Sequence, residues 1–293
     1  MKKMTGKNTL MLFLTAFIWG TAFVAQSVGM DYIGPFTFTC VRSLIGGIFL
    51  IPCICFLDKW RAKNDGAERQ KKADRKEEKK NVILGGICCG LALCVASNLQ
   101  QIGIQYTTVG KAGFITALYI VLVPIFGIFL KKKAGVRIWI SVAISVAGLY
   151  LLCITDKLVL AKGDILVIDY FSPKADSVRI ACTQFFITGV LSAIPMFLFE
   201  TPRLSDIFAA AVPVLYAGVL SSGVAYTLQI VAQKDADPTV ASLILSLESV
   251  FSVLGGWVIL GQKLSIREIA GCILMFSAII LAQLPGKPEN KEA

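Results

Sequence analysis

The chain has 293 residues, of which 56% are hydrophobic and 16% are charged, and its mean hydropathy is +0.72. Soluble domains contain about 45–50% apolar and about 25% charged residues, so this composition excludes a water-soluble protein. The formal net charge of +10 could indicate a nucleic-acid surface, but the basic residues lie in short segments between long apolar runs. We therefore expect no nucleic-acid partner.

Nine apolar runs follow one another along the chain, and most approach the about 20 residues that a helix needs to cross a bilayer. The runs are Leu10–Val28, Phe36–Leu57, Val82–Gly103, Ala112–Leu130, Ile138–Ile154, Ile180–Phe199, Ile207–Val231, Val240–Leu260 and Ile266–Leu284. The first run is too long for a signal-peptide core and lacks a cleavage site, so we interpret it as the first span. The pattern predicts an all-α polytopic membrane protein in a lipid bilayer.

Basic residues cluster before the first run, between the second and third, and after the fourth. The clusters are Lys2–Lys7, Asp58–Lys80, which holds ten basic and six acidic residues, and Lys131–Arg137. If the spans alternate in direction, the three clusters lie on one side, and the positive-inside rule places that side and the N-terminus in the cytoplasm. We expect a bacterial plasma-membrane protein in which Asp58–Lys80 is a solvated, mobile loop or a frayed helix.

Several kinds of chemistry lack their usual residues in this sequence. The chain has no histidine, which removes the commonest metal ligand and the histidine-based catalytic pairs. Its nine cysteines are scattered through apolar runs without CxxC spacing, so we interpret them as packing residues. No glycine-rich phosphate loop is present either. We therefore expect no metal site, no cofactor and no enzymatic activity.

A weak internal repeat relates the two halves of the chain. Gln101–Gln105 reads QIGIQ, and Gln229–Gln233 reads QIVAQ at a spacing of 128 residues. The pair Lys133 and Arg137 corresponds in the same way to Lys263 and Arg267. The repeat predicts two five-helix units, residues 1–156 and 157–293, and an odd number of helices would invert the second unit in the membrane. Chance similarity between apolar segments is the alternative.

Five short motifs resemble those of the drug/metabolite transporter superfamily, in the form with two tandem EamA-type domains. They are Trp19–Phe23, Thr39–Leu44 with Arg42, Gly110–Leu118, Leu247–Phe251 and Leu260–Ser265. The resemblance covers nearly the whole chain and implies a ten-helix carrier, often an exporter of amino acids or other small metabolites. The chain departs from the family pattern at Ser249, where proline is usual, and at Gln262, where glutamate is usual.

The sixth helix of such a fold is short or missing in this sequence. Between Ile154 and Ile180 the longest apolar run is Ile165–Phe171, which Asp169 interrupts. Seven helical residues rise only about 10 Å, about a third of a bilayer. We expect nine complete spans and a short, irregular or re-entrant sixth element. A transport-defective or scaffold paralogue is therefore an alternative to a working transporter.

Two ionisable residues inside the apolar runs are the first candidates for a solute site, because buried charge is costly in a membrane. Glu248 lies near the middle of Val240–Leu260 and could bind a substrate ammonium group or carry a coupling proton. Its alternative is a protonated side chain that hydrogen-bonds a neighbouring helix. Arg42 could attract a substrate carboxylate. Its alternatives are snorkelling to the membrane surface and pairing with Asp31.

Polar and aromatic residues provide a second set of candidates. Asn98, Gln101 and Gln105 have i, i+3, i+7 spacing, which places them on one helix face, and the same spacing relates Tyr226, Gln229 and Gln233. The two faces could form the walls of a cavity, or they could serve helix–helix hydrogen bonding. Trp19 and Tyr119 could stack on a solute or anchor the helices at the membrane interface. Thr116 and Lys111 are weaker candidates.

These observations predict a secondary transporter for a small polar metabolite, with possible coupling to protons. A membrane-embedded enzyme is disfavoured by the absence of histidine and of clustered carboxylates. The sequence does not define the solute, the coupling ion or an oligomeric state.

Overall fold

Helices make up all regular structure in the residues that the computed structural model describes, which are 5–64, 72–117, 136–153, 176–233, 236 and 238–283. They are α1 (Gly6–Gly29), α2 (Pro35–Asn64), α3 (Lys72–Ile104), α4 (Val109–Ala117), α6 (Val136–Cys153), α8 (Ser177–Phe199), α9 (Leu204–Ala209), α10 (Ala211–Leu215), the π-helix η1 (Tyr216–Ala225), α11 (Tyr226–Gln233), α12 (Pro238–Leu245), α13 (Leu247–Leu260) and α14 (Ile266–Gln283).

Six stretches among the described residues are long and apolar enough to cross a membrane. They are Gly6–Gly29, Pro35–Lys59, Glu77–Ile104, Ser177–Phe199, Ala211–Gln233 and Val240–Leu260. The apolar helices α6 and α14 add 18 residues each. Large apolar side chains such as Phe197 and Val258 are exposed, as expected where a helix contacts lipid. The prediction of an all-helical polytopic membrane protein is confirmed for the described residues.

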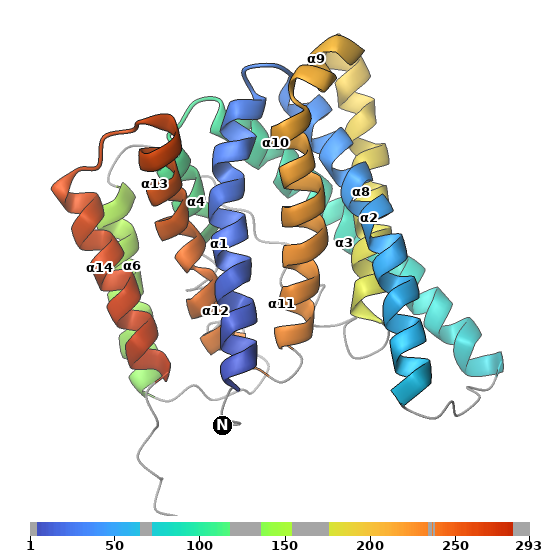
Figure 1. The fold of residues 1–293 in the computed structure, drawn as a ribbon, viewed down its shortest axis with the longest axis horizontal. Helices are drawn as coiled ribbons and strands as arrows, with labels where there is room; N and C mark the ends of the chain where they lie inside the picture. The colour runs from blue at the N-terminus through green and yellow to red at the C-terminus, as the bar shows by residue number, and fades with distance from the viewer. Residues whose placement is uncertain are drawn as a thin grey trace, which may run out of the picture.

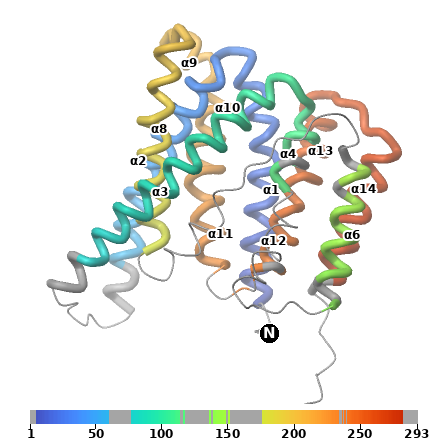
Figure 2. Tube along the Cα trace, turned by 180° about the vertical axis from the view of Figure 1, so that it is seen from behind, coloured from blue at the N-terminus to red at the C-terminus, as the bar shows by residue number. Residues whose placement is uncertain are grey.

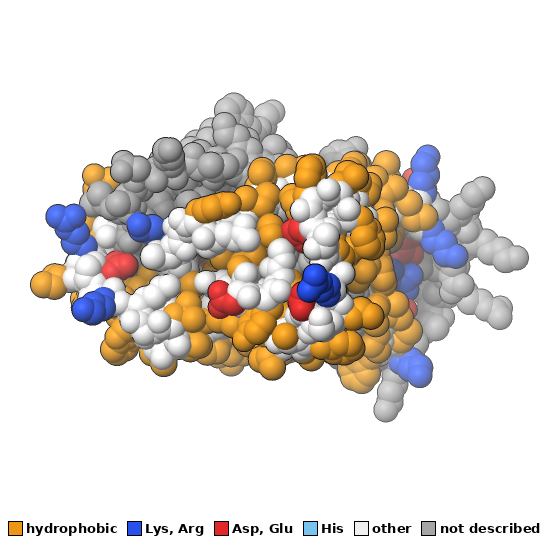
Figure 3. All heavy atoms as spheres, turned by 90° about the horizontal axis from the view of Figure 1, so that it is seen from above, with side chains coloured by type: hydrophobic (Ala, Val, Ile, Leu, Met, Phe, Trp, Pro, Cys, Tyr) orange, Lys and Arg blue, Asp and Glu red, His pale blue; other side chains and the backbone are white. Residues whose placement is uncertain are grey.

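The helix α1 lies in the middle of the bundle, between α13 on one side and the α10–η1–α11 segment on the other (Figure 1). Beyond α11, helices α2, α3 and α8 pack together, whereas α6 and α14 form a pair at the opposite edge (Figure 2). Seen from above, the end of the bundle carries charged side chains as scattered groups among apolar ones (Figure 3). The arrangement places α1 where two groups of helices meet.

Local sequence signals explain where several helices begin and end. The Thr5 hydroxyl accepts a hydrogen bond from the amide of Asn8 at the start of α1, at 3.3 Å, and the Asp176 carboxylate does the same for Val178 at the start of α8, at 3.0 Å. Helix α13 ends at Gly261, whose φ of +64° is a left-handed conformation that glycine adopts without strain. These caps satisfy backbone groups that the helices leave unpaired.

Both ends of α2 are tied to α8 by charged groups. At the upper end, the Glu200 carboxylate accepts hydrogen bonds from the amides of Phe36 and Thr37, each at 2.8 Å, in the first turn of α2. At the lower end, Arg179 Nη2 lies 2.8 Å from Asp58 Oδ2. Between these ends the Cys182 thiol donates to the Gly47 carbonyl at 3.4 Å. Helix α2 is therefore fixed along its length against α8.

The structure can be compared with the sequence prediction in the segment between the second and third spans and at two of the later spans. The described parts of Asp58–Lys80 are helical, in line with the alternative of a helix, because α2 continues to Asn64 and α3 begins at Lys72, and lysine, arginine and glutamate are good helix formers. The runs Ile207–Val231 and Val240–Leu260 are each interrupted, at Ala210 and Ser246. The second part of Ala112–Leu130 and the predicted sixth element lie outside the described residues.

Candidate functional site

The α10–η1–α11 span is widened by the π-helix η1, and α1 binds the carbonyl groups of that segment. The indole Nε1 of Trp19 donates to the Ser221 carbonyl at 3.2 Å, and the Thr15 hydroxyl donates to the Ala225 carbonyl at 3.3 Å. In a π-helix the backbone bonds run from i to i+5, and such segments occur frequently at functional sites. Side chains of α1 therefore hold an irregular segment in the centre of the bundle.

Three aromatic rings form a row beside this segment. The Tyr226 ring lies 5.3 Å from the ring of Trp19 and 5.0 Å from that of Phe185, measured between centroids, and both contacts are edge-to-face. The rings come from α11, α1 and α8. Edge-to-face packing is a favourable aromatic arrangement and presents flat apolar surface together with the polar Tyr226 hydroxyl. Two of these rings, those of Trp19 and Tyr226, were predicted as site residues from the sequence.

Arg42 lies next to this row on α2. Its side chain is 8% exposed, and its helix packs against η1, which ends just before Tyr226, and against α8, which carries Phe185. Its Nε is buried and has no hydrogen-bond partner among the described residues. Asp31 is exposed and forms no ion pair with Arg42. The alternatives of snorkelling and of pairing with Asp31 therefore do not describe Arg42 in this structure.

Glu248 occupies the first turn of α13, directly after the break at Ser246, and is 2% exposed. The break follows from hydroxyl groups that bond back to the helix, because Ser246, Ser249 and Ser252 each donate to the carbonyl three residues earlier, at 2.7–2.8 Å. Such bonding competes with the regular helical pattern and bends helices. The interruption is confined to Ser246, whose φ of −62° and ψ of −11° stay in the right-handed helical region.

The backbone of α13 at Glu248 is in close contact with α1. A methyl group placed on Gly20 would lie 2.6 Å from the Glu248 carbonyl oxygen and 3.0 Å from the Ser252 amide nitrogen. Only glycine allows this approach. Helix α13, which carries Glu248, packs on one side of α1 (Figure 1). Helix α2, which carries Arg42, lies on the other side, beyond the α10–η1–α11 segment. Glu248 and Arg42 therefore belong to helices on opposite sides of α1.

The predicted polar face of α3 is divided between packing and exposure. Asn98 and Gln101 are buried, and their amides donate to Ser192 Oγ at 2.8 Å and to the Gln26 carbonyl at 3.3 Å. Their side-chain carbonyl oxygens have no hydrogen-bond partner among the described residues. Gln105 is exposed, because α3 ends at Ile104. The structure therefore brings Asn98 and Gln101 into the bundle and leaves Gln105 outside it.

The other predicted residues are more dispersed. Gln229 and Gln233 are half-buried on α11, and Lys111 is half-buried on α4. The Thr116 hydroxyl donates to the Ala112 carbonyl and accepts from Gln100 Nε2 at 2.9 Å. Tyr119 lies outside the described residues. These positions show no common cluster with Glu248 or Arg42 in the part of the chain that the structure describes.

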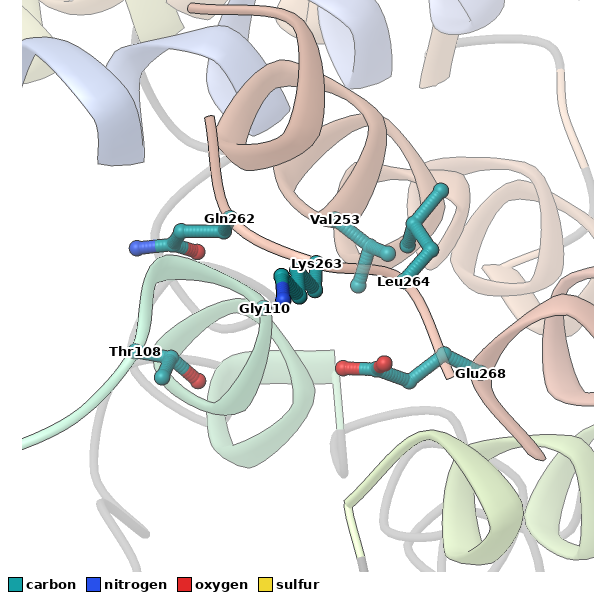
Figure 4. A pocket seen from close by; sticks show the side chains of 7 residues that line it. All are labelled: Thr108, Gly110, Val253, Gln262, Lys263, Leu264 and Glu268. Atoms are coloured by element: carbon teal, nitrogen blue, oxygen red, sulfur yellow. The ribbon is translucent and has the colours of Figure 1, made fainter. Parts of the chain in front are cut away.

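A separate pocket of about 240 Å³ opens at the upper end of the bundle, where α4 begins and α13 passes into α14. Its lining residues are Thr108, Gly110, Val253, Gln262, Lys263, Leu264 and Glu268. Figure 4 shows the Glu268 carboxylate and the Thr108 side chain on opposite sides, with Lys263 between them. Glu268 also caps α14, because its Oε2 accepts from the Ser265 amide at 2.7 Å. None of the residues predicted from the sequence to bind the solute lines this pocket.

Sequence reasoning did not identify Phe185, Ser221 or the π-helix. The nearest signal is the run of small residues Gly218, Ser221, Ser222 and Gly223, which does not specify a π-helix by itself. Among the described residues, no group of three histidine, cysteine, aspartate or glutamate side chains could hold a metal ion.

Comparison with known proteins gives consistent results. The EamA-like transporter family matches residues 7–154 and again residues 164–284. An uncharacterized transporter of Archaeoglobus fulgidus is 29% identical over 285 residues, covering 93% of this chain and 84% of the relative. The uncharacterized transporter YoaV of Bacillus subtilis is 22% identical over 294 residues, covering 94% and 96%. A solved crystal structure of 19% identity superposes with a TM-score of 0.63 and covers 97% of this chain and 99% of its own, which supports the fold.

The two family matches together take in most of the chain, and they agree with the resemblance that the sequence motifs indicated. The relatives share nearly the full length of this protein and are transporters by name. The chain belongs to the EamA-like transporter family and is a membrane transporter rather than an enzyme.

Proposed function

We propose that this membrane transporter is a secondary carrier that exports a small polar metabolite, such as an amino acid, by alternating access. The observation that carries the proposal is the buried carboxylate of Glu248, which lies inside a candidate span in the turn after the interruption at Ser246 between α12 and α13. Secondary transporters typically bind solutes and coupling ions at broken helices near the middle of the membrane. Glu248 would bind the ammonium group of the solute or carry a coupling proton.

The positions of the repeated motifs support an inverted relation between residues 1–156 and 157–293. The first motif lies at the end of α3, at the upper end of the bundle, whereas the second lies in α11, at the lower end (Figure 1). The helices α2 and α8, α6 and α14, and α4 and α13 would be corresponding elements of the two units, and each of these pairs is in contact. Alternating access would then be a rocking of one unit against the other.

The remaining predicted residues belong to the same proposal as the lining of the solute path. They are Arg42, Asn98, Gln101, Gln105, Tyr226, Gln229, Gln233, Trp19, Tyr119 and Thr116. Buried amide oxygens without a partner at Asn98 and Gln101 favour this role for two of them, because an unpaired buried polar group is costly unless a ligand or water completes it.

The cytoplasmic location of the N-terminus is a further part of the proposal, and it places the lower end of the bundle inside the cell. A cysteine introduced at Asn64 in a background with serine at all nine cysteines should react with a membrane-impermeant maleimide only after the cells are opened. Labelling in intact cells would show that the protein has the opposite orientation in the membrane.

A transport-defective or scaffold protein is the second candidate, because the sixth segment is short in sequence. The alignment with YoaV runs over 294 residues but occupies only 94% of this 293-residue chain, so the alignment contains positions that this chain lacks. If the missing positions correspond to the sixth helix, insertion of about 20 apolar residues after Val167 should raise stability or transport.

Transport by purified protein in liposomes separates the two candidates. The twenty standard amino acids, each radiolabelled, are loaded singly, and efflux is measured with and without a pH gradient against protein-free liposomes. We expect efflux of at least one amino acid above the control. Absence of efflux for every amino acid from correctly folded protein, together with restored efflux after the insertion, would favour the defective protein.

A further inference from the structure

Arg42 is a positive charge in the interior of a membrane protein without a counter-ion in the part of the chain that the structure describes. No acidic side chain there lies within 4.0 Å of its guanidinium, and its Nε makes no hydrogen bond. An arginine on a membrane helix costs about 2.5–3.5 kcal/mol on insertion scales, and removing one partner of a buried ion pair is strongly destabilising because it leaves the other charge uncompensated. An anionic ligand that meets this charge would therefore be bound favourably.

The surroundings of Arg42 hold it in a fixed position. Its helix is tied to α8 by Glu200 at one end and by Asp58 and Arg179 at the other. Its backbone packs closely on the π-helix η1, since a methyl group placed on Gly218 would lie 3.0 Å from the Arg42 carbonyl oxygen. With 8% of its surface exposed, the side chain is enclosed by protein. The guanidinium is thus presented inside the bundle on a rigid support.

The groups next to Arg42 suit an organic anion. Tyr226 directly follows the η1 segment on which α2 packs, and the rings of Trp19 and Phe185 pack on Tyr226 at centroid distances of 5.3 and 5.0 Å. A guanidinium can donate two parallel hydrogen bonds to one carboxylate, a geometry that an inorganic spherical ion cannot match. The half-buried rings of Trp19 and Tyr226 offer apolar surface for the rest of the molecule, whereas the Phe185 ring is 3% exposed and belongs to the core. Both features point to a carboxylate that carries a carbon skeleton.

We propose that Arg42 and Tyr226 form a subsite for the carboxylate of the transported solute, with Trp19 as its apolar wall and the buried Phe185 as a support for the Tyr226 ring. The proposal rests on the proposed transport function and specifies its substrate class as carboxylates and zwitterions, not amines or neutral polar solutes. Glu248 lies on the other side of α1, so the carboxylate and the coupling group would occupy separate positions.

Trp19 makes the subsite measurable without transport. The chain has four tryptophans, and replacement of Trp60, Trp139 and Trp257 by phenylalanine leaves Trp19 as the single reporter. The full-length protein in lipid nanodiscs, in chloride-free buffer, is titrated with each of the twenty amino acids, with acetate, lactate and benzoate, and with the primary amide of every acid that binds. Chloride is titrated separately. The fluorescence of Trp19 reports occupancy.

We expect saturable binding of at least one carboxylate and at least tenfold weaker binding of its amide. Arg42→Gln should weaken carboxylate binding at least tenfold, and Arg42→Lys should weaken it less, because it keeps the charge but loses the paired donors. Arg203→Gln, which removes an exposed arginine at the start of α9, is the matched control and should bind as the parent protein does. If Arg42→Gln does not fold, the comparison of each acid with its amide and the binding by Arg42→Lys still test the carboxylate subsite.

Equal binding of acid and amide, unchanged binding in Arg42→Gln, a response to chloride alone, or no response to any probe would each overturn the subsite. The liposome experiment distinguishes this failure from failure of the transport function. Carboxylate binding without efflux would contradict transport and leave the subsite in place. Efflux that is equal for acid and amide and persists in Arg42→Gln would contradict the subsite and leave transport in place.

Discussion

The two helix pairs α2–α8 and α1–α13 are held together by different means. The first pair is joined at both ends by carboxylates, through Glu200 and through Asp58 with Arg179. The second pair is joined by a close approach at Gly20, next to the buried Glu248, and by the Phe251 ring, whose centroid lies 5.3 Å from those of Phe13 and Phe17. The structure shows no ion pair between the described residues of α1 and α13. One interface depends on directional polar bonds and the other on shape.

The difference has a mechanical consequence. Polar ties at the two ends fix the length and the direction of α2, so this pair is suited to be the frame that presents Arg42. No ion pair joins the described residues of α1 and α13. These two helices can therefore shift against each other as long as their packed surfaces stay complementary. Removing one polar interaction between α2 and α8 should therefore lower the stability of the protein only slightly. A larger side chain at Gly20 should separate α1 from α13 and lower the stability more.

The largest effect is expected for Gly20→Val. The new side chain would collide with backbone atoms of Glu248 and Ser252, which cannot rotate away, and overpacking costs about 1–3 kcal/mol, occasionally more. We expect the upper end of this range because the collision is with backbone. Thermal unfolding in detergent measures the loss. Gly103→Val is the matched control, because nothing lies within 4 Å of the position of its new Cβ, and it should leave the melting temperature nearly unchanged. Similar melting temperatures for the two variants would contradict the description of the α1–α13 contact.

The next effect concerns function at the same interface. Glu248→Gln keeps the size and hydrogen-bonding capacity of the side chain but removes its charge and titratable proton, so folding should survive while transport falls at least tenfold, about 1.4 kcal/mol of lost stabilisation. Efflux from liposomes measures the change, and Glu77→Gln, at an exposed position on α3, is the control. Unchanged efflux in correctly inserted protein would assign Glu248 to helix packing.

The contrast between the two pairs also marks what the sequence could predict. Runs of apolar residues are sufficient to predict spans, since the membrane imposes one helix length on all of them. The buried positions of Asn98 and Gln101 follow from the same helical periodicity. Gln105 does not follow the pattern, because the periodicity contains no signal for the end of α3 at Ile104.

The parts of the site that the sequence did not predict depend on tertiary contacts. The π-helix exists where Thr15 and Trp19 of α1 bind its carbonyls, more than 200 residues away in sequence. The environment of Arg42 depends on how α2 packs against η1 and α11, so its separation from the nearby Asp31 could not be read from their spacing. Phe185 enters the site only because α8 lies beside α11. Local propensity does not encode such meetings of distant helices.

A smaller effect is expected when one tie of the α2–α8 frame is removed. Glu200→Gln would replace a charged acceptor at the first turn of α2 by a neutral amide, and capping interactions of this kind contribute about 1 kcal/mol. The free energy of unfolding in detergent should fall by about this amount. Asp31→Asn, which changes an exposed carboxylate in the turn just before α2, is the control and should have little effect. An equal loss in both variants would indicate a general charge effect instead of a cap.

The smallest effect is expected at the lower end of the frame, between Asp58 and Arg179. Their side chains are 43% and 37% exposed, and water and salt screen an ion pair at such a position. A double-mutant cycle with Asp58→Asn and Arg179→Gln should give a coupling free energy of about 0.5 kcal/mol, which declines as salt is raised. A coupling as large as the effect of Glu200→Gln, or one that is independent of salt, would mean that this end is shielded from solvent and that both ties hold α2 equally.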